Sequence, residues 1–174
     1  MKATFVRNPE TKMTEMVQID DARITFRNFS GTPDAFTREG DRSFSLIIPN
    51  QEIADALIND HNQYGVGWNV KIKPPKDVDD QPFMHLKVKV KFNGRGPAVY
   101  LKSGDNMRML DEVTVGILDK IDIQSVDLDI RPYDDEGRWG PFRAAYLQSI
   151  HVTQKIDRFA ARYSSEDEDY PFDN

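Results

Sequence analysis

The stretch that most clearly decides the fold is residues 85–92, which read HLKVKVKF. Apolar and charged residues alternate here with a period of two, which is typical of a strand with one face on the core. The leucine, the valines and the phenylalanine then face inward, and Lys87, Lys89 and Lys91 face the solvent. Neighbouring lysines in this row are about 7 Å apart, because residues on the same face are two strand rises apart.

The same alternation predicts several further strands along the chain. In residues 22–28, Ile24 and Phe26 are expected on the core side, opposite the two arginines. Proline and acidic residues fill 74–82, which predicts a long exposed loop or the tip of a protruding hairpin. The other predicted strands are 42–49, 68–73, 98–103, 125–133 and 142–155.

Two segments have features of short helices. Residues 51–60 follow Asn50, a good N-cap, and place apolar residues four apart. Residues 111–120 begin at Asp111, another possible cap, although a glycine and several β-branched residues lower the helix propensity. The sequence leaves open which of the two is the main helix.

About seven short strands with one or two short helices predict an all-β fold, an antiparallel barrel with a helix at one end. The apolar content falls after about residue 156. We therefore expect a folded domain over 1–156 and an acidic, disordered C-terminal tail over 157–174, because a run of carboxylates cannot bury enough apolar surface to offset the entropy of ordering.

The charge of the chain is unevenly distributed. The net charge is -6, but the last eleven residues hold five acids and no base, which leaves 23 basic and 24 acidic side chains in 1–163. The body is thus nearly neutral, so local clusters of charge, and not the net charge, indicate which partners it binds. There is no cysteine, and no stretch has the length of a membrane span, so we expect a cytoplasmic protein.

Cations and aromatics are interleaved along much of the body, which is typical of a groove for single-stranded nucleic acid. Cations follow the phosphates, and flat rings stack on the bases. Each aromatic taken alone is more often a core residue, and those in predicted loops are the better candidates. The predicted binding residues are Arg23, Arg27, Phe29, Phe36, Arg38, Arg42, Trp68, Lys71, Lys73, Lys76, Phe83, Lys87, Lys89, Lys91, Arg95, Tyr100, Lys102 and Trp139.

An active site is hard to assemble from this sequence. The three histidines are far apart in sequence, and no phosphate-binding loop, nucleophile elbow or metal-ligand spacing occurs. Asp127 and Asp129 share one predicted strand face, as a metal-dependent nuclease requires, but Arg131 lies on that face and can neutralise them. We therefore expect no enzyme activity, cofactor or metal.

The chain ends in SSEDEDYPFDN, residues 164–174, where carboxylates precede two aromatics around a proline. This ending resembles the acidic tails of bacterial and phage single-stranded DNA-binding proteins. The resemblance implies that the tail recruits replication or recombination proteins and competes with DNA for the basic groove. In the bacterial proteins the chain stops at Pro-Phe, whereas here two residues follow. The predicted partner-binding residues are Glu166, Asp167, Glu168, Asp169, Tyr170 and Phe172.

Blocks of the body are similar to phage-encoded single-stranded DNA-binding proteins of the oligonucleotide/oligosaccharide-binding (OB) fold. The likeness covers most of 20–155, in segments such as ARITFRNFSG (22–31) and AAYLQSIHVT (144–153). It implies an OB-fold-like barrel that coats and protects single-stranded DNA in phage replication or recombination, in the host cytoplasm. Two alternatives remain open at this point, a barrel that binds no DNA and serves interaction or virion assembly, and a metal-dependent nuclease.

Overall fold

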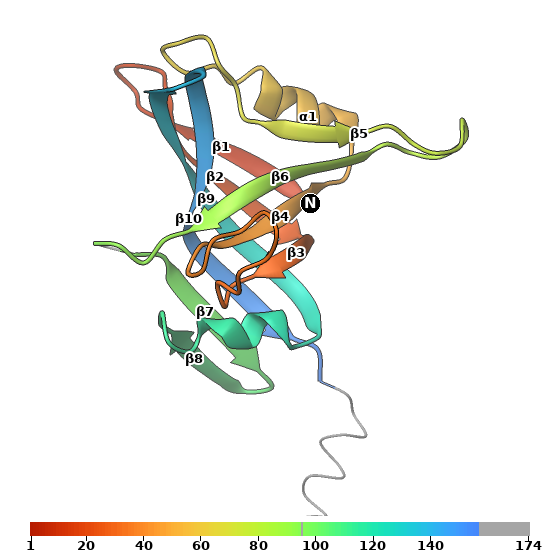
Figure 1. The fold of residues 1–174 in the computed structure, drawn as a ribbon, viewed down its shortest axis with the longest axis vertical. Helices are drawn as coiled ribbons and strands as arrows, with labels where there is room; N and C mark the ends of the chain where they lie inside the picture. Colours follow the sequence, from red (N-terminus) through yellow and green to blue (C-terminus); the bar gives the residue numbers. More distant parts are fainter. Residues whose placement is uncertain (95, 157–174) are drawn as a thin grey trace, which may run out of the picture.

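Ten strands, one α-helix and one 3-10 helix make up the part of the chain described by the computed structural model, residues 1–94 and 96–156 (Figure 1). This confirms the expected fold class, mostly β with one or two short helices. The elements are β1 (Lys2–Arg7), β2 (Thr14–Ala22), β3 (Ile24–Asn28), β4 (Arg42–Ile48), α1 (Gln51–Ile58), β5 (Val70–Lys73), β6 (Phe83–Val90), β7 (Ala98–Ser103), β8 (Asn106–Leu110), the 3-10 helix η1 (Val115–Asp119), β9 (Ile123–Gly137) and β10 (Gly140–Gln154).

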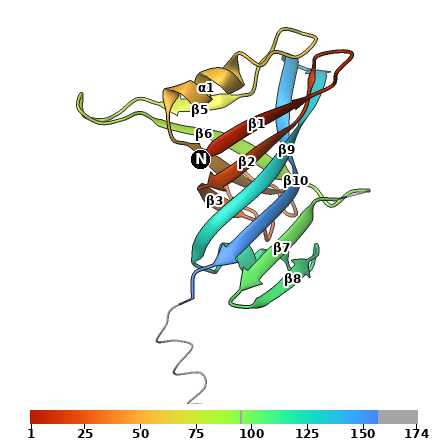
Figure 2. The same ribbon diagram turned by 180° about the vertical axis from the view of Figure 1, so that it is seen from behind.

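One curved, open sheet contains all ten strands (Figures 1 and 2). Seven of them follow the order β1-β2-β9-β10-β6-β4-β3, while β5 pairs with β6, β7 pairs with β10, and β8 pairs with β7. Strand β10 is the branching strand. It pairs with β9 along its length, with β6 through Ala145 and Tyr146, and with β7 through residues 149–153. The pairings with β6 and β7 are parallel, so the sheet is mixed where the sequence predicted an antiparallel one.

The core lies inside the curve of the sheet and follows the alternation seen in the sequence. In β6 the residues Met84, Leu86, Val88 and Val90 are buried. Strands β9 and β10 contribute a second set from the opposite wall, and β2 and β4 complete it. Burial of one residue in two along β6 and along much of β9 and β10 fixes their register, because a slip by one residue would turn the apolar set outward.

The two helices differ in kind and in position. Asn50 caps α1 by accepting a hydrogen bond from the Ile53 amide at 2.9 Å, and the helix buries Ala54 and Leu57. At the second segment the Asp111 carboxylate accepts the Thr114 amide at 2.9 Å, and only 115–119 are helical, as a 3-10 turn. The α-helix of the described chain is therefore α1.

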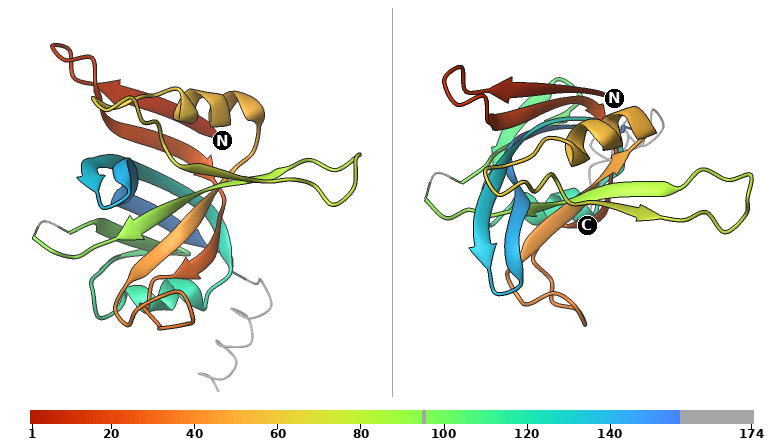
Figure 3. Two further views of the ribbon diagram at one scale, coloured as in Figure 1. Left: turned by 45° about the horizontal axis from the view of Figure 1, so that its top comes forward. Right: turned by 90° about the horizontal axis from the view of Figure 1, so that it is seen from above.

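The hairpin of β5 and β6 extends from the body as an arm, with the loop 74–82 at its tip (Figure 3). All residues from Lys71 to Gln81 are exposed. The sequence predicted this protrusion from its prolines and acids. It did not predict β1, β2 or β8: β1 pairs with its neighbour β2, β8 pairs with its neighbour β7, and β2 also pairs with the distant β9.

A buried ionic cluster anchors the β9–β10 hairpin to the body. The Arg143 guanidinium, almost fully buried, donates to both carboxylate oxygens of Asp134 at 2.8 and 3.1 Å. It also donates to the Asp60 backbone oxygen at 2.8 Å and to the Asp60 carboxylate at 3.2 Å. Trp68 and Thr14 donate to the same carboxylate, each at 2.8 Å. Each charged side chain of this cluster has an oppositely charged, hydrogen-bonded partner. A buried charge requires such a partner.

Candidate nucleic-acid interface

The lysines of β6 form the row that the sequence predicted. Lys87, Lys89 and Lys91 alternate with buried residues and lie on the outward face of the sheet. We call these three residues the lysine row. On the β4 side the row faces small residues, because Ser45 pairs with Lys87 and Ser43 pairs with Lys89. These small side chains leave space beside the row.

Two stacked tyrosines lie on the other side of the lysine row. Tyr146 of β10 pairs with Lys89, and its ring stacks on Tyr133 of β9 with centroids 5.2 Å apart and planes 6° from parallel. The Lys91 ammonium and the Arg131 guanidinium each lie 5.3 Å from the Tyr146 centroid. We call Tyr133 and Tyr146 the tyrosine stack. It brings ring faces and cations together, as binding of a single strand requires.

The tyrosine stack is held in place by a hydrogen bond. The Tyr133 hydroxyl donates to the Asp135 carboxylate at 3.2 Å, and this bond raises the pKa of Tyr133 above its ordinary value. Tyr133 therefore stays neutral at physiological pH. The site prediction omitted both tyrosines, because each lies in a regular strand where an aromatic is normally a core residue. The alternation of 125–133 and 142–155 contains the missing signal, since both tyrosines fall on the outward phase.

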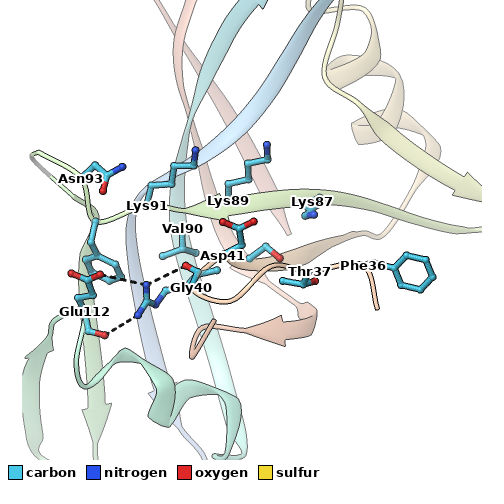
Figure 4. Close-up of a pocket in the computed structure, with 13 residues that line it drawn as sticks. Phe36, Thr37, Gly40, Asp41, Lys87, Lys89, Val90, Lys91, Asn93 and Glu112 are labelled. Carbon is cyan, nitrogen blue, oxygen red and sulfur yellow. Dashed lines mark hydrogen bonds and ion pairs between the residues drawn. The ribbon is translucent and has the colours of Figure 1, made fainter. Parts of the chain in front are cut away.

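A pocket of about 310 Å³ opens between the lysine row and the loop that precedes β4 (Figure 4). All three lysines line it, together with Phe36, which is 99% exposed. Asp34 accepts the Phe36 amide at 2.7 Å, and this bond lowers the pKa of the Asp34 carboxyl. The loop thus presents an exposed Phe36 beside the lysine row, and its role in stacking on a base stays a prediction.

Arg42 lines the same pocket but is held by the protein. Its guanidinium pairs with the Glu112 carboxylate at 3.6 Å, lies 5.6 Å from the Phe92 centroid, and donates to the Glu112 backbone oxygen at 3.3 Å. Dashed lines in Figure 4 mark the ion pair and the hydrogen bond at Glu112. Arg42 therefore stabilises the pocket wall, and its predicted contact with a ligand stays a prediction.

Three predicted contact residues prove to be structural. Phe29 is 0% exposed and stacks on Phe44 in the core with centroids 5.1 Å apart. Trp68 is 2% exposed and belongs to the ionic cluster around Arg143. Arg27 donates to the backbone oxygens of Leu118 and Ile121 at 2.7 and 2.8 Å and so holds η1 in place. The predicted stacking roles of Phe29 and Trp68 are wrong, because neither ring can reach a base.

The remaining predicted residues fall into three groups. Lys71 and Lys73 pair with His85 and Phe83, so the arm adds these two cations and Phe83 to the face of the lysine row. Lys102 and Tyr100 lie on β7, where Tyr100 borders a hollow with Asp127 and Asp129, separate from the lysines. The others are exposed on loops or strand ends, namely Arg23, Arg38, Lys76 and Trp139, the last 92% exposed at the β9–β10 tip. Arg95 and the tail residues lie outside the described chain.

The carboxylates considered for a nuclease are used in hydrogen bonds. Asp127 accepts the Asp21 amide at 2.8 Å, and Asp129 accepts the Ser149 hydroxyl at 3.0 Å. Within residues 1–94 and 96–156, no three His, Cys, Asp or Glu side chains gather as metal ligands. The same residues contain no helix that is long and apolar enough to cross a membrane.

The chain is similar to known proteins both in sequence and in fold. Residues 7–172 match a family model described as "Putative phage ssDNA-binding domain". The fold is similar to a single-stranded DNA-binding protein from bacteriophage Enc34, with a TM-score of 0.50, 15% identity, and 91% of this chain and 93% of that chain covered.

Two further structures of the Enc34 protein are also similar. Its C-terminal truncation has a TM-score of 0.53 at 16% identity, covering 90% of this chain and 97% of that one. Its complex with ssDNA has a TM-score of 0.51 at 14% identity, covering 91% and 98%. The likeness shows a shared OB-like fold over nearly the whole chain. Comparison with curated protein sequences gives no match.

Proposed function

The chain belongs to the family of phage ssDNA-binding domains, and from this premise we propose that it coats and protects single-stranded DNA in phage replication or recombination. It acts by binding and not by catalysis, in the cytoplasm of the host. The lysine row between Phe36 and the tyrosine stack is the single observation that best supports this function.

The chemistry of the row suits a single strand of any sequence. Lysine spacing of about 7 Å is close to the spacing of phosphates on an extended strand, so successive cations can each neutralise one phosphate. Ring faces on both sides accept any base, because stacking does not read base edges. Stacking on the protein favours ssDNA over a duplex, because in a duplex the bases already stack on each other.

The acidic tail gives the protein a second role in this proposal. A tethered polyanion is present at high effective concentration beside its own cationic face and competes with DNA for it. When DNA displaces the tail, Tyr170 and Phe172 become free to bind an apolar notch ringed by basic groups on a replication or recombination protein. Coating of the strand would thus signal to the enzymes that act on it.

A binding titration tests the DNA-binding face. We compare the wild type with a variant in which Lys87, Lys89 and Lys91 are replaced by Ala, using anisotropy of labelled oligo-dT at several salt concentrations. Loss of three phosphate contacts should weaken binding and lower the steepness of log K against log salt by about 2, at roughly 0.7 per contact.

A matched control separates the row from net charge. Replacing Lys12, Lys120 and Lys155 by Ala removes the same charge from exposed positions away from β6. This control should bind nearly as the wild type does. Equal titrations for the two triple variants, both folded, would remove the lysine row from the site, and absence of wild-type binding would contradict the function itself.

A further inference from the structure

Phe26 has an unusual backbone for an aromatic residue. Its φ is +49°, in the left-handed region that a bulky side chain rarely adopts. It lies where the pairing of β3 with β4 shifts register, between Thr25 and Asn28. The irregularity turns the ring away from the core, so that it is 66% exposed. The sequence had placed Phe26 inside, and that prediction was wrong for this reason.

The exposed ring does not stand alone. Its centroid lies 6.3 Å from Phe83 and 5.8 Å from His85, both on β6, with the ring planes near perpendicular to it. Phe83 and His85 stack on each other at 5.1 Å. The Ser45 hydroxyl is 3.2 Å from His85 Nδ1 and fixes that ring. Three rings thus form an aromatic corner, defined here as Phe26, Phe83 and His85.

Cations surround the aromatic corner. Lys71 pairs with His85 and Lys73 with Phe83 on the neighbouring strand, while Lys87 follows His85 on the same face of β6. His85 itself adds little charge at neutral pH, because partial burial, and secondly Lys71, lower its pKa. The corner therefore combines open ring faces with phosphate-binding groups at the arm end of the lysine row.

We infer that the aromatic corner is a second base-stacking subsite, which holds the DNA strand at the opposite end of the lysine row from the tyrosine stack. This deepens the proposed function and rests on it. The corner and the stack are about 14 Å apart along β6, from His85 to Lys89, at 3.4 Å per residue. A strand that follows the lysines would meet one aromatic site at each end.

Backbone strain supports a functional role over a structural one. A non-glycine residue in the left-handed region raises the free energy of the folded state, and such outliers gather at functional sites. Register irregularities like the one beside Phe26 redirect single side chains, and they are common next to functional sites. A ring that served only the fold would gain more by pointing into the core than by remaining 66% exposed.

Substitution of Phe26 tests the inference because stability and binding should respond differently. Phe26→Asn removes the ring and relieves the left-handed strain, since Asn tolerates that conformation. We expect an unchanged or higher melting temperature and oligo-dT binding weakened about 5- to 150-fold, the factor for one stacked base. Phe26→Leu, which keeps bulk without a ring, should weaken binding similarly, and Phe26→Tyr should retain it.

Photocrosslinking of the wild type gives a second readout that does not depend on a variant folding. Oligo-dT that contains 5-iodouracil should crosslink to the peptides with Phe26 or Phe83. If both ring-removing variants bind as the wild type does, or if crosslinks form only at β10 and the Phe36 loop, the inference is overturned while the proposed function stands. Failure of the wild type to bind oligo-dT would overturn both.

Discussion

At the scale of single residues, burial separates two kinds of arginine and two kinds of aromatic that look alike in the sequence. Arg143 is buried in an ionic cluster, and Arg131 is exposed beside Tyr146. Phe29 is in the core and Phe36 is fully exposed. Residues of the same type thus stabilise the fold in one place and are available to a ligand in another.

Replacement of Arg143 should reveal the cost of an unpaired buried charge. Arg143→Ala leaves the carboxylates of Asp60 and Asp134 without their main partner, which is expected to lower the free energy of unfolding by about 3–5 kcal/mol. Urea denaturation followed by circular dichroism measures this. Arg131→Ala, at an exposed site, should stay within roughly 0.5 kcal/mol of the wild type yet bind DNA more weakly. A stable Arg143→Ala protein would show that the cluster contributes little.

The lowered pKa of His85 predicts how the stability of the fold depends on pH. Its pKa is lower in the folded protein than in the unfolded chain, so the unfolded chain binds the proton first as the pH falls. The stabilisation is complete above the ordinary histidine value of about 6.5 and is lost as the pH falls below it. The melting temperatures of the wild type and of His85→Gln should therefore approach each other as the pH is lowered from 8 to 5. Parallel curves would show that His85 does not contribute.

At the scale of elements, β6 shows how one strand serves both fold and function. Its inner residues belong to the core, and its outer residues form the lysine row and part of the aromatic corner. The sequence predicted this division because a period of two is a local property. It also predicted the β5–β6 protrusion and the Asn50 cap of α1 from local signals.

Elements that depend on pairing with another strand were not predictable in the same way. Strand β8 reads NMRML, with low β-propensity, and is a strand because it pairs with β7. Phe26 was misplaced because the shift in register next to it is fixed by β4. The tyrosine stack joins residues 133 and 146 across a hairpin, and its place beside Lys89 results from a parallel pairing that no local pattern indicates.

The arm allows a prediction about a single loop. We expect replacement of 74–82 by Asn-Gly to leave stability nearly unchanged, because residues 74–81 are exposed. Lys76 is a predicted contact residue, but DNA affinity should fall only slightly, because Asp77, Asp79 and Asp80 beside it offset its charge. Melting temperature and oligo-dT anisotropy measure the two effects. A large loss of affinity with an intact fold would show that Lys76 or the loop contacts the strand.

At the scale of the whole molecule, the net charge conceals two opposite regions. The body is nearly neutral overall but brings Lys71, Lys73 and the lysine row to one face, while 164–174 contain five acids and no base. These two regions have opposite charges and belong to one chain, so the concentration of protein does not set their encounter. Salt should weaken the binding of the tail to this face, and it should also weaken the binding of DNA there.

Removal of the tail should therefore tighten DNA binding. We expect a chain that ends at residue 163 to bind oligo-dT several-fold more tightly than the full chain at low salt, with the difference vanishing at high salt. A variant with Glu166, Asp167, Glu168 and Asp169 changed to the corresponding amides keeps the length and should behave in the same way. Weaker binding after removal would show that the tail does not compete with DNA.

The branching position of β10 has a consequence for how the protein is made. This strand joins the β6 and β7 parts of the sheet to β9, and it is the last strand of the described chain. During synthesis, the apolar sides of β4, β6 and β7 cannot close against β10 until residues 140–154 have left the ribosome. A nascent chain stopped before residue 140 would expose these strands to chaperones and to aggregation, and the described fold is complete only once β10 has been made.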